Sequence, residues 1–305
     1  MKTETLAQVA PATAATTLPS LPSLPGLPDL PGAPSVHIVI RRTPPRIVDE
    51  LREVWDHREL FYFLAWRDVR VRYKQTVLGV AWAVLQPLLG VIVSSLIFGR
   101  LAHVPSDGIA YPLFFYAGSL PWMLMASGVG ASAASLVGSP NLITRVYFPR
   151  MIIPAAAVLS GLIDFLIAAL GLGVLMVRYR VAPSWQLLLV APVLGLILLL
   201  TCAVGGWLAA VNVKYRDVRY VVPFFMQIWF FATPVIYPAS LVPPQWRVLL
   251  ALNPMAGFID AFRAACFGRP FDSVTFAIST GVTFALLTLA IRTFRSIEQT
   301  FADFI

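Results

Sequence analysis

The chain has 305 residues, of which 58% are hydrophobic and only 12% are charged, and its net charge is +8. A soluble protein has about 25% charged residues, so this composition excludes an ordinary soluble domain. The Lys and Arg residues stand at the ends of apolar segments, where they act as topology signals of membrane proteins. We therefore expect membrane lipids, and no nucleic acid, among the partners.

Residues 1–45 form a segment of a different kind, with nine prolines. The segment lacks the long apolar core of a signal peptide. Its composition predicts a disordered or extended Pro-rich leader.

Residues 46–76 show apolar positions at helical spacing with charged residues between them. Trp and Tyr favour the headgroup level of a bilayer, and Arg and Lys favour its anionic inner surface. The pattern predicts a cytoplasmic amphipathic helix in the membrane interface, continuing into the first span. A soluble helix packed on another element is the alternative.

Six later stretches carry almost no charge. Each is long enough, as a helix, to cross a hydrocarbon layer about 30 Å thick. Lipid offers no hydrogen-bond partners, so helices are the expected spanning elements. The predicted fold class is an all-α integral membrane protein, with a permease domain at residues 77–292 and a cytoplasmic tail at 293–305. The six predicted spans are 77–99, 111–137, 151–177, 186–211, 220–237 and 273–291.

The positive charges orient these spans. An even number of spans places both ends of the chain on one side of the membrane. Seventeen of the 23 Lys and Arg residues then lie on the side of the ends, and six lie on the other side. The positive-inside rule therefore predicts that both ends are cytoplasmic.

Residues 238–272 are too apolar for a solvated loop, yet Arg247, Asp260 and Arg263 argue against a full span. Pro254 divides the segment into two pieces that are each too short to cross. We expect two short re-entrant or periplasmic helices before the last span. A helical hairpin lying on the outer membrane surface is an equally supported alternative.

The sequence lacks the motifs of an enzyme. There is no G-x-x-x-x-G-K-[ST] phosphate-binding loop, and none of the three lysines follows a glycine. Asp164 is the one carboxylate inside the predicted spans, which leaves acid–base chemistry without a partner. We expect no catalytic residue, no metal and no cofactor in this chain, so ATP hydrolysis must occur in another subunit.

The segment RDVRVRYKQTVLGVAWAVLQPL resembles the signature of type-2 ABC transporter permeases of the polysaccharide exporter family, the O-antigen and teichoic-acid branch. The resemblance implies a homodimer with two ABC ATPase subunits that bind ATP and Mg. It also implies a lipid-linked polysaccharide substrate, such as one carried on undecaprenyl diphosphate. The resemblance covers about residues 47–300, and its motifs in chain order are 67–88, 139–150, 212–220, 233–238 and 252–255.

Aromatic residues at the span ends are candidates for a passage. Sugar hydroxyls cannot cross hydrocarbon unsatisfied, and aromatic faces cover sugar rings without requiring one hydroxyl pattern. For each residue, an aromatic belt or lipid-facing packing is the alternative. We expect a channel at the homodimer interface, lined mainly by the first, second and fifth spans. The candidates are Trp82, Tyr116, Trp122, Phe225 and Trp229.

Two groups of residues are candidates for contacts at the cytoplasmic side. Arg forks match phosphate oxygens, so the basic run before the first span can receive a lipid diphosphate; binding of ordinary anionic lipid is the alternative. The short loop 138–150 resembles the element that couples family members to the ATPase, although a plain connecting loop is the alternative. The headgroup candidates are Arg67, Arg70, Arg72 and Lys74, and the coupling candidates are Arg145, Tyr147, Phe148 and Arg150.

Asp164 and Gln86 are the polar residues singled out inside spans. A charge inside the bilayer costs about 2.5–3.5 kcal/mol on insertion scales. We therefore expect Asp164 to face the helix bundle or the dimer interface, where it either finds a donor or is protonated. We expect a structural role, with proton coupling as the alternative.

The predicted function is that of a bacterial inner-membrane permease exporting lipid-linked polysaccharide. An exporter of capsule, teichoic acid, small lipid or drug is the alternative within the same mechanistic class. A membrane-embedded glycosyltransferase or acyltransferase is a more distant alternative, because it requires acid–base residues that the sequence lacks.

Overall fold

A computed structural model describes residues 56–74, 79–140, 142, 148–270 and 272–298. All the described residues belong to one compact unit. The Pro-rich leader, the end of the C-terminal tail and the candidates Arg145 and Tyr147 lie outside the described residues.

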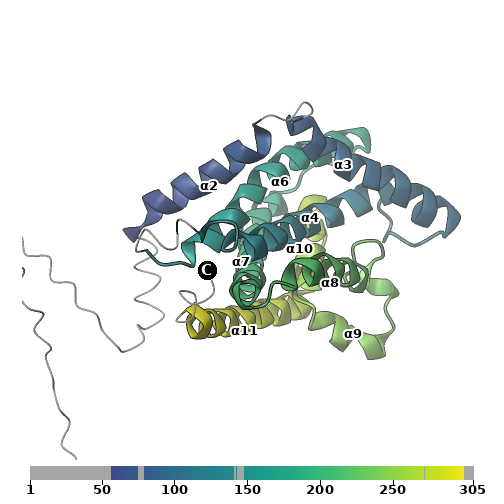
Figure 1. The fold of residues 1–305 in the computed structure, drawn as a ribbon. Helices are drawn as coiled ribbons and strands as arrows, with labels where there is room; N and C mark the ends of the chain where they lie inside the picture. Colours follow the sequence, from purple (N-terminus) through teal and green to yellow (C-terminus); the bar gives the residue numbers. More distant parts are fainter. Residues whose placement is uncertain (1–55, 75–78, 141, 143–147, 271, 299–305) are drawn as a thin grey trace, which may run out of the picture. The chain divides into compact units, whose positions relative to one another are not determined.

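All regular structure in the described residues is helical (Figure 1). The elements in chain order are α2 (Arg58–Tyr73), α3 (Gly79–Ser94), η1 (Ser95–Leu101), α4 (Tyr111–Ser135), α6 (Ile152–Arg178), η2 (Trp185–Leu189), α7 (Val190–Lys214), α8 (Val218–Ala232), η3 (Ala239–Leu241), α9 (Pro244–Ala251), α10 (Pro254–Phe267) and α11 (Ser273–Glu298).

Five helices are long and apolar enough to cross a membrane. They correspond to the first, second, third, fourth and sixth predicted spans, which are thereby confirmed as helices of spanning length. Their bounds are Ala81–Leu101, Tyr111–Ser135, Ile152–Arg178, Trp185–Lys214 and Ser273–Glu298.

The fifth predicted span differs from the expectation. Helix α8 has only 15 residues, which is about 22 Å of helix. The chain leaves the helix after Ala232 and continues as a buried, irregular segment at residues 233–236. The expected helix end at residue 237 was wrong, because the segment stays apolar past the true end.

Helices α9 and α10 are the two short helices expected before the last span. Their axes are bent by 98° at the break between Ala251 and Pro254. Asn253 caps α10, since its side chain accepts a hydrogen bond from the Met255 backbone N–H, and Pro254 occupies the first turn. The bend thus has a local cause in the sequence.

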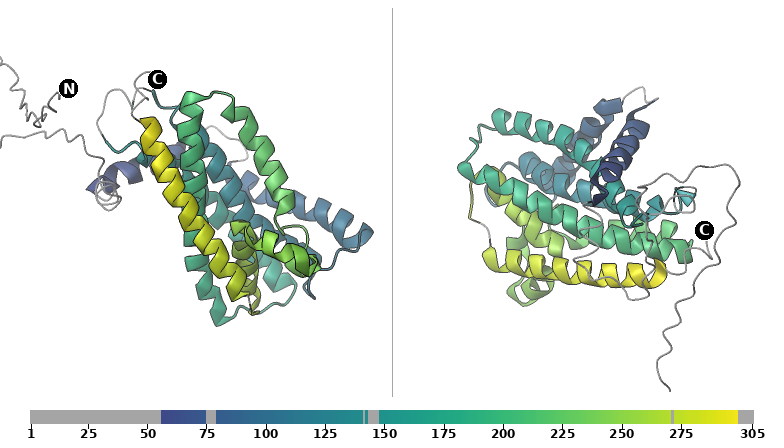
Figure 2. Two further views of the ribbon diagram at one scale, coloured as in Figure 1. Left: turned by 90° about the horizontal axis from the view of Figure 1, so that it is seen from below. Right: turned by 90° about the vertical axis from the view of Figure 1, so that its left-hand side faces the viewer.

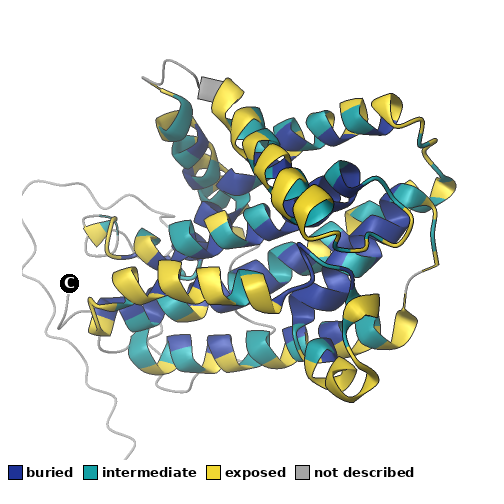
Figure 3. Cartoon of the chain, turned by 90° about the vertical axis from the view of Figure 1, so that its right-hand side faces the viewer, coloured by how far each residue is buried: buried dark blue, intermediate teal, exposed yellow. Residues whose placement is uncertain are grey.

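Helix α4 is the most buried of the five long helices and packs against α6 and α7. Small residues permit this close approach. A Cβ atom at Gly128 would lie 2.6 Å from Thr201 of α7, and one at Gly205 of α7 would lie 2.6 Å from Ser132. Helices α7 and α11 also run side by side, as both panels of Figure 2 show. Helices on the outside of the bundle carry both buried and exposed residues (Figure 3).

Successive segments that connect the long helices lie at opposite ends of the bundle. One apolar cluster joins Leu64 of α2, Phe148, Val213 of α7 and Phe294 of α11. At the other end, Ser240 Oγ donates a hydrogen bond to Asp107 Oδ1 at 2.7 Å. This separation is what a chain that threads back and forth through lipid requires.

Helix α2 packs along α6 through Leu64 and Val69, which are buried. Its other side exposes Tyr62, Phe63 and Trp66. The helix therefore has a packed face and an exposed aromatic face. Its last turn reaches the middle of α6, and this contact forms part of the site described next.

Candidate functional site

A cavity of about 790 Å³ lies between α2, α3, α4 and α6. Its volume falls within the roughly 300–1,000 Å³ range of small-molecule sites. Residues chosen from the sequence for three separate reasons meet on its wall. They are the aromatic candidates Trp82 and Trp122, the basic candidate Arg72, and the intramembrane polar candidates Gln86 and Asp164.

The charged corner of the cavity is built around Asp164. Arg72 Nη1 donates to Asp164 Oδ2, and the Tyr73 hydroxyl donates to Asp164 Oδ1. Each carboxylate oxygen therefore has a donor, which offsets the cost of a charge inside a span. Both donors to Asp164 come from α2.

Tyr73 is a dependable donor at this corner. Burial, followed by the hydrogen bond to Asp164, raises the pKa of Tyr73 to about 12. The hydroxyl therefore keeps its proton at neutral pH and remains able to donate to the carboxylate.

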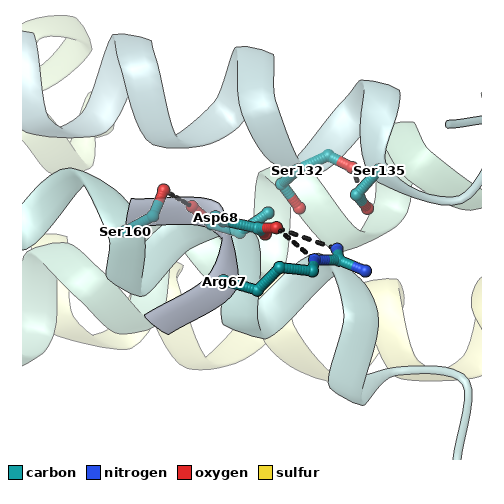
Figure 4. A network of polar contacts seen from close by, with 6 residues as sticks. Arg67, Asp68, Ser132, Ser135 and Ser160 are labelled. Atoms are coloured by element: carbon teal, nitrogen blue, oxygen red, sulfur yellow. Dashed lines mark hydrogen bonds and ion pairs between the residues drawn. The ribbon is translucent and has the colours of Figure 1, made fainter. Parts of the chain in front are cut away.

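The basic run does not form a single cluster of cations. Arg67 bonds to its neighbour Asp68 through Nε at 3.0 Å and Nη2 at 2.8 Å. Figure 4 shows this pair with Ser132 and Ser135 of α4 and Ser160 of α6. Arg70 and Lys74 are exposed and make no side-chain ion pair within the described part of the chain. Of the four candidates, Arg72 alone lines the cavity.

An aromatic wall continues from this cavity toward α8. The ring of Trp122 lies edge-on to Trp229 at 6.0 Å and 5.6 Å from Phe230, and Trp229 lies 5.3 Å from Phe225. Trp122 also lines two smaller cavities of about 460 and 170 Å³. Trp122 is therefore the residue at which three cavities meet, and the sequence-based grouping of Trp122, Phe225 and Trp229 corresponds to real contacts.

Tyr116 does not lie on this wall. The residue is completely buried, and its hydroxyl donates to the Ala168 carbonyl of α6 at 2.8 Å. Tyr116 is six residues before Trp122, a spacing that turns the two side chains to different faces of α4. Its expected role in a passage lining is replaced by a role in packing α4 on α6.

Asn253 supports the aromatic wall from α10, and sequence analysis did not single it out. Its Oδ1 accepts a hydrogen bond from Trp229 Nε1 at 2.9 Å, and its Nδ2 donates to Thr233 Oγ1 at 2.9 Å. One amide therefore joins the end of α8 to the start of α10. The sequence signal was present, because Asn followed by Pro is typical of a helix N-terminus.

Arg263 has a second supporting role that the sequence did not reveal. It is 6% exposed, and its guanidinium donates to the carbonyls of Phe114 at 3.2 Å, Pro234 at 2.7 Å and Val235 at 2.7 Å. Buried carbonyls outside a helix need donors, especially in a membrane. Arg263 of α10 supplies two of them to the irregular segment after α8.

The predicted coupling residues are placed only in part. Phe148 is 6% exposed and packs into the cluster with Leu64 and Phe294, so its ring is not available to a partner in this arrangement. Arg150 Nη1 donates to the Glu298 carbonyl at 3.0 Å, which ties the loop to the end of α11.

The described residues contain no group of three or more His, Cys, Asp or Glu that could hold a metal ion. The described residues on the cavity wall offer one guanidinium, one carboxylate, the neutral polar side chains of Tyr73, Gln86 and Ser127, and aromatic faces.

Comparison with known proteins supports a transport role. The chain is 31% identical over 258 residues to the O-antigen export system permease protein RfbA of Myxococcus xanthus, covering 83% of this chain and 98% of that protein. It is 26% identical over 251 residues to RfbA of Klebsiella pneumoniae, with 80% and 94% covered. It is 23% identical over 235 residues to the polysialic acid transport protein KpsM of Escherichia coli, with 76% and 91% covered.

A family model for the ABC-2 type transporter matches residues 59–267. The match includes α2, the cavity, the aromatic wall and the bent pair α9 and α10. The chain therefore belongs to the ABC-2 type transporter family, as a multi-pass membrane permease that carries no ATPase domain of its own.

Proposed function

We propose that the chain is the permease subunit of an ATP-driven exporter that moves lipid-linked polysaccharide out of the cytoplasm across the bacterial inner membrane. Three relatives named for O-antigen export or polysialic acid transport support this substrate class. The single observation that carries it is the match to an O-antigen export permease over 98% of that protein's length.

The cavity suits the parts of such a substrate. A lipid-linked glycan has an isoprenoid tail, a diphosphate and sugar rings. Trp82 and Trp122 offer flat faces to sugars or isoprene units, and Arg72 offers a guanidinium that matches phosphate oxygens. Contacts of this kind are weak individually, so a long polymer can move past them.

We propose that the passage is completed by a second copy of the chain. The outer faces of α3 and α8 carry exposed apolar residues, including Trp82, Leu89, Phe224 and Phe231. Within a bilayer these faces contact either lipid or another subunit. Pairing two copies through the first and fifth spans would extend the cavities around Trp122 into a lined route, and symmetric dimers are the commonest assembly.

We further propose that two ABC ATPase subunits, holding ATP and Mg, bind at the end of the bundle where α2, α6, α7 and α11 meet. The positive-inside rule assigns this end of the bundle to the cytoplasm. The packing of Phe148 and the Arg150 bond to α11 hold the last residues of the loop against the bundle. Arg145 and Tyr147 remain the candidate contacts of that loop.

Deletion of the gene, followed by localisation of long glycans, tests the function. We expect loss of surface polysaccharide and accumulation of lipid-linked polymer inside the cell, with both restored by the wild-type gene. Normal surface glycans together with a new drug sensitivity would favour export of a small molecule instead. Loss of an acidic capsule rather than O-antigen would favour the role named for the Escherichia coli relative.

A further inference from the structure

The charge on the cavity wall is confined to one corner. Among the described residues that line the cavity, Arg72 and Asp164 are the charged ones, and they are paired with each other. The rest of the wall is mostly apolar, with Gln86 and Ser127 as neutral polar side chains. A cavity with one charged corner and mostly apolar walls matches an amphiphile with a charged head.

Arg72 is the cation of the basic run that such a head can reach inside the cavity. Arg67 is bonded to Asp68, and Arg70 and Lys74 do not line the cavity. The Arg72 side chain remains 34% exposed and that of Asp164 30% exposed, so an incoming ligand can reach both.

Arg72 also has bonding capacity in reserve. A guanidinium has five N–H donors. Among the bonds between described residues, Arg72 gives one of these donors, on Nη1, to Asp164. A phosphate group presents more oxygen acceptors and more negative charge than one carboxylate, and it can accept two parallel bonds from the guanidinium fork.

We propose that Asp164 is an internal substitute for the anionic head of the carrier lipid, and that the diphosphate of a polyisoprenyl carrier binds Arg72 in this cavity by displacing it. In the absence of substrate, Asp164 keeps Arg72 neutralised and joins the end of α2 to α6. When the diphosphate binds, the Tyr73 hydroxyl continues to donate to Asp164 Oδ1. This inference rests on the proposed function and adds which residue receives the head group and what occupies its place beforehand.

A purely structural ion pair makes the opposite prediction. If Asp164 only anchors α2, its replacement weakens the site and therefore weakens ligand binding. If Asp164 competes with the ligand, its replacement by the neutral, similarly sized Asn strengthens binding. The two readings differ in the sign of the effect.

The test is a double-mutant cycle on the full-length chain, purified together with its co-expressed ATPase subunits in nanodiscs of zwitterionic lipid. The probe is undecaprenyl diphosphate, and the readout is its dissociation constant. We expect Asp164→Asn to tighten binding about three- to tenfold, from the loss of a partly exposed ion pair and its repulsion of the ligand. We expect Arg72→Ala to weaken binding by about tenfold or more, from the loss of charge-assisted bonds.

The cycle contains its own controls. Asp164→Asn should tighten binding less in the Arg72→Ala background than in the wild type, because without Arg72 the carboxylate no longer competes for a guanidinium and only its repulsion of the ligand remains. Arg70→Ala should change binding by less than about twofold, because Arg70 does not line the cavity. Arg72→Lys keeps the positive charge that pairs with Asp164 but loses the forked guanidinium. This variant should therefore fold normally and bind the ligand more weakly than the wild type.

Unchanged or weaker binding by correctly inserted Asp164→Asn overturns the inference. If that variant does not insert, wild-type affinity in Arg72→Lys overturns it. The same pattern with phosphatidylglycerol as the probe assigns the site to ordinary anionic lipid, and also overturns it. If gene deletion abolishes export but binding does not depend on Arg72, the inference is overturned and the proposed function stands. If binding depends on Arg72 but gene deletion leaves export intact, the proposed function is overturned and the inference stands.

Discussion

Substitutions at Gly118 and Arg263 test directly how the irregular segment after α8, residues 233–236, is stabilised. A Cβ atom at Gly118 would lie 2.1 Å from Arg263 Nη2 and 2.8 Å from its Cζ. The guanidinium is buried over the Phe114 ring, 3.7 Å from the ring centre. It therefore cannot move aside without giving up its carbonyl partners, and we expect Gly118→Ala to displace it.

The cost follows from the bonds that are lost. Displacement breaks the two short bonds to Pro234 and Val235, and hydrogen bonds to charged groups contribute about 1.5–3 kcal/mol each. Inside a membrane no water is present to donate hydrogen bonds to the carbonyls that lose Arg263. Allowing for partial relaxation, we expect Gly118→Ala to lower the free energy of unfolding by about 3–5 kcal/mol.

Gly130→Ala is the matched control, because Gly130 lies on the same helix and a Cβ there would meet nothing within 4 Å. We expect it to change the free energy of unfolding by less than about 0.5 kcal/mol. Titration of both variants with SDS in detergent unfolds them and measures the difference in their free energies of unfolding. In the double variant Gly118→Ala/Arg263→Ala, the alanine at 118 should add little to the cost of Arg263→Ala. Equal stability of Gly118→Ala and Gly130→Ala would refute the assigned role of Arg263.

Three further outcomes are expected. Asn253→Ala should lower the free energy of unfolding by about 1 kcal/mol through loss of a helix cap. Asn253→Ala combined with Trp229→Phe should cost less than the sum of the two single variants, because both remove the same hydrogen bond. Unfolding in detergent measures these costs, and strict additivity would contradict the expectation. Trp122→Ala should reduce surface glycan while Trp122→Phe retains most of it, and equal export in both would remove Trp122 from the passage. The hydrogen bond from Thr275 holds the pKa of Asp272 below its ordinary value. The Asp272 carboxylate therefore stabilises the start of α11 above the pKa of a free aspartate, and this stabilisation is lost as the pH falls through the lowered pKa. Asp272→Asn should remove this part of the pH dependence of thermal unfolding.

Much of the fold followed from the sequence. Five of the six charge-poor stretches correspond to helices of spanning length, and Pro254 with its flanking charges predicted the two short helices that precede the last span. The signature at residues 67–88 indicated the family to which the chain belongs. These features depend on segments read one at a time, because lipid selects each segment by its own hydrophobicity.

The tertiary structure decided which side chains act together. The true end of α8 depends on Arg263 and Asn253, which lie about 20 to 30 residues later in the chain, and Asp164 finds its partners 91 and 92 residues earlier. Tyr116 and Trp122 are both aromatic and belong to one span, yet only the packing of α4 places one in the core and the other on the cavity wall. Hydropathy is a property of a single segment, whereas the satisfaction of a buried carbonyl or carboxylate depends on which distant segment packs beside it.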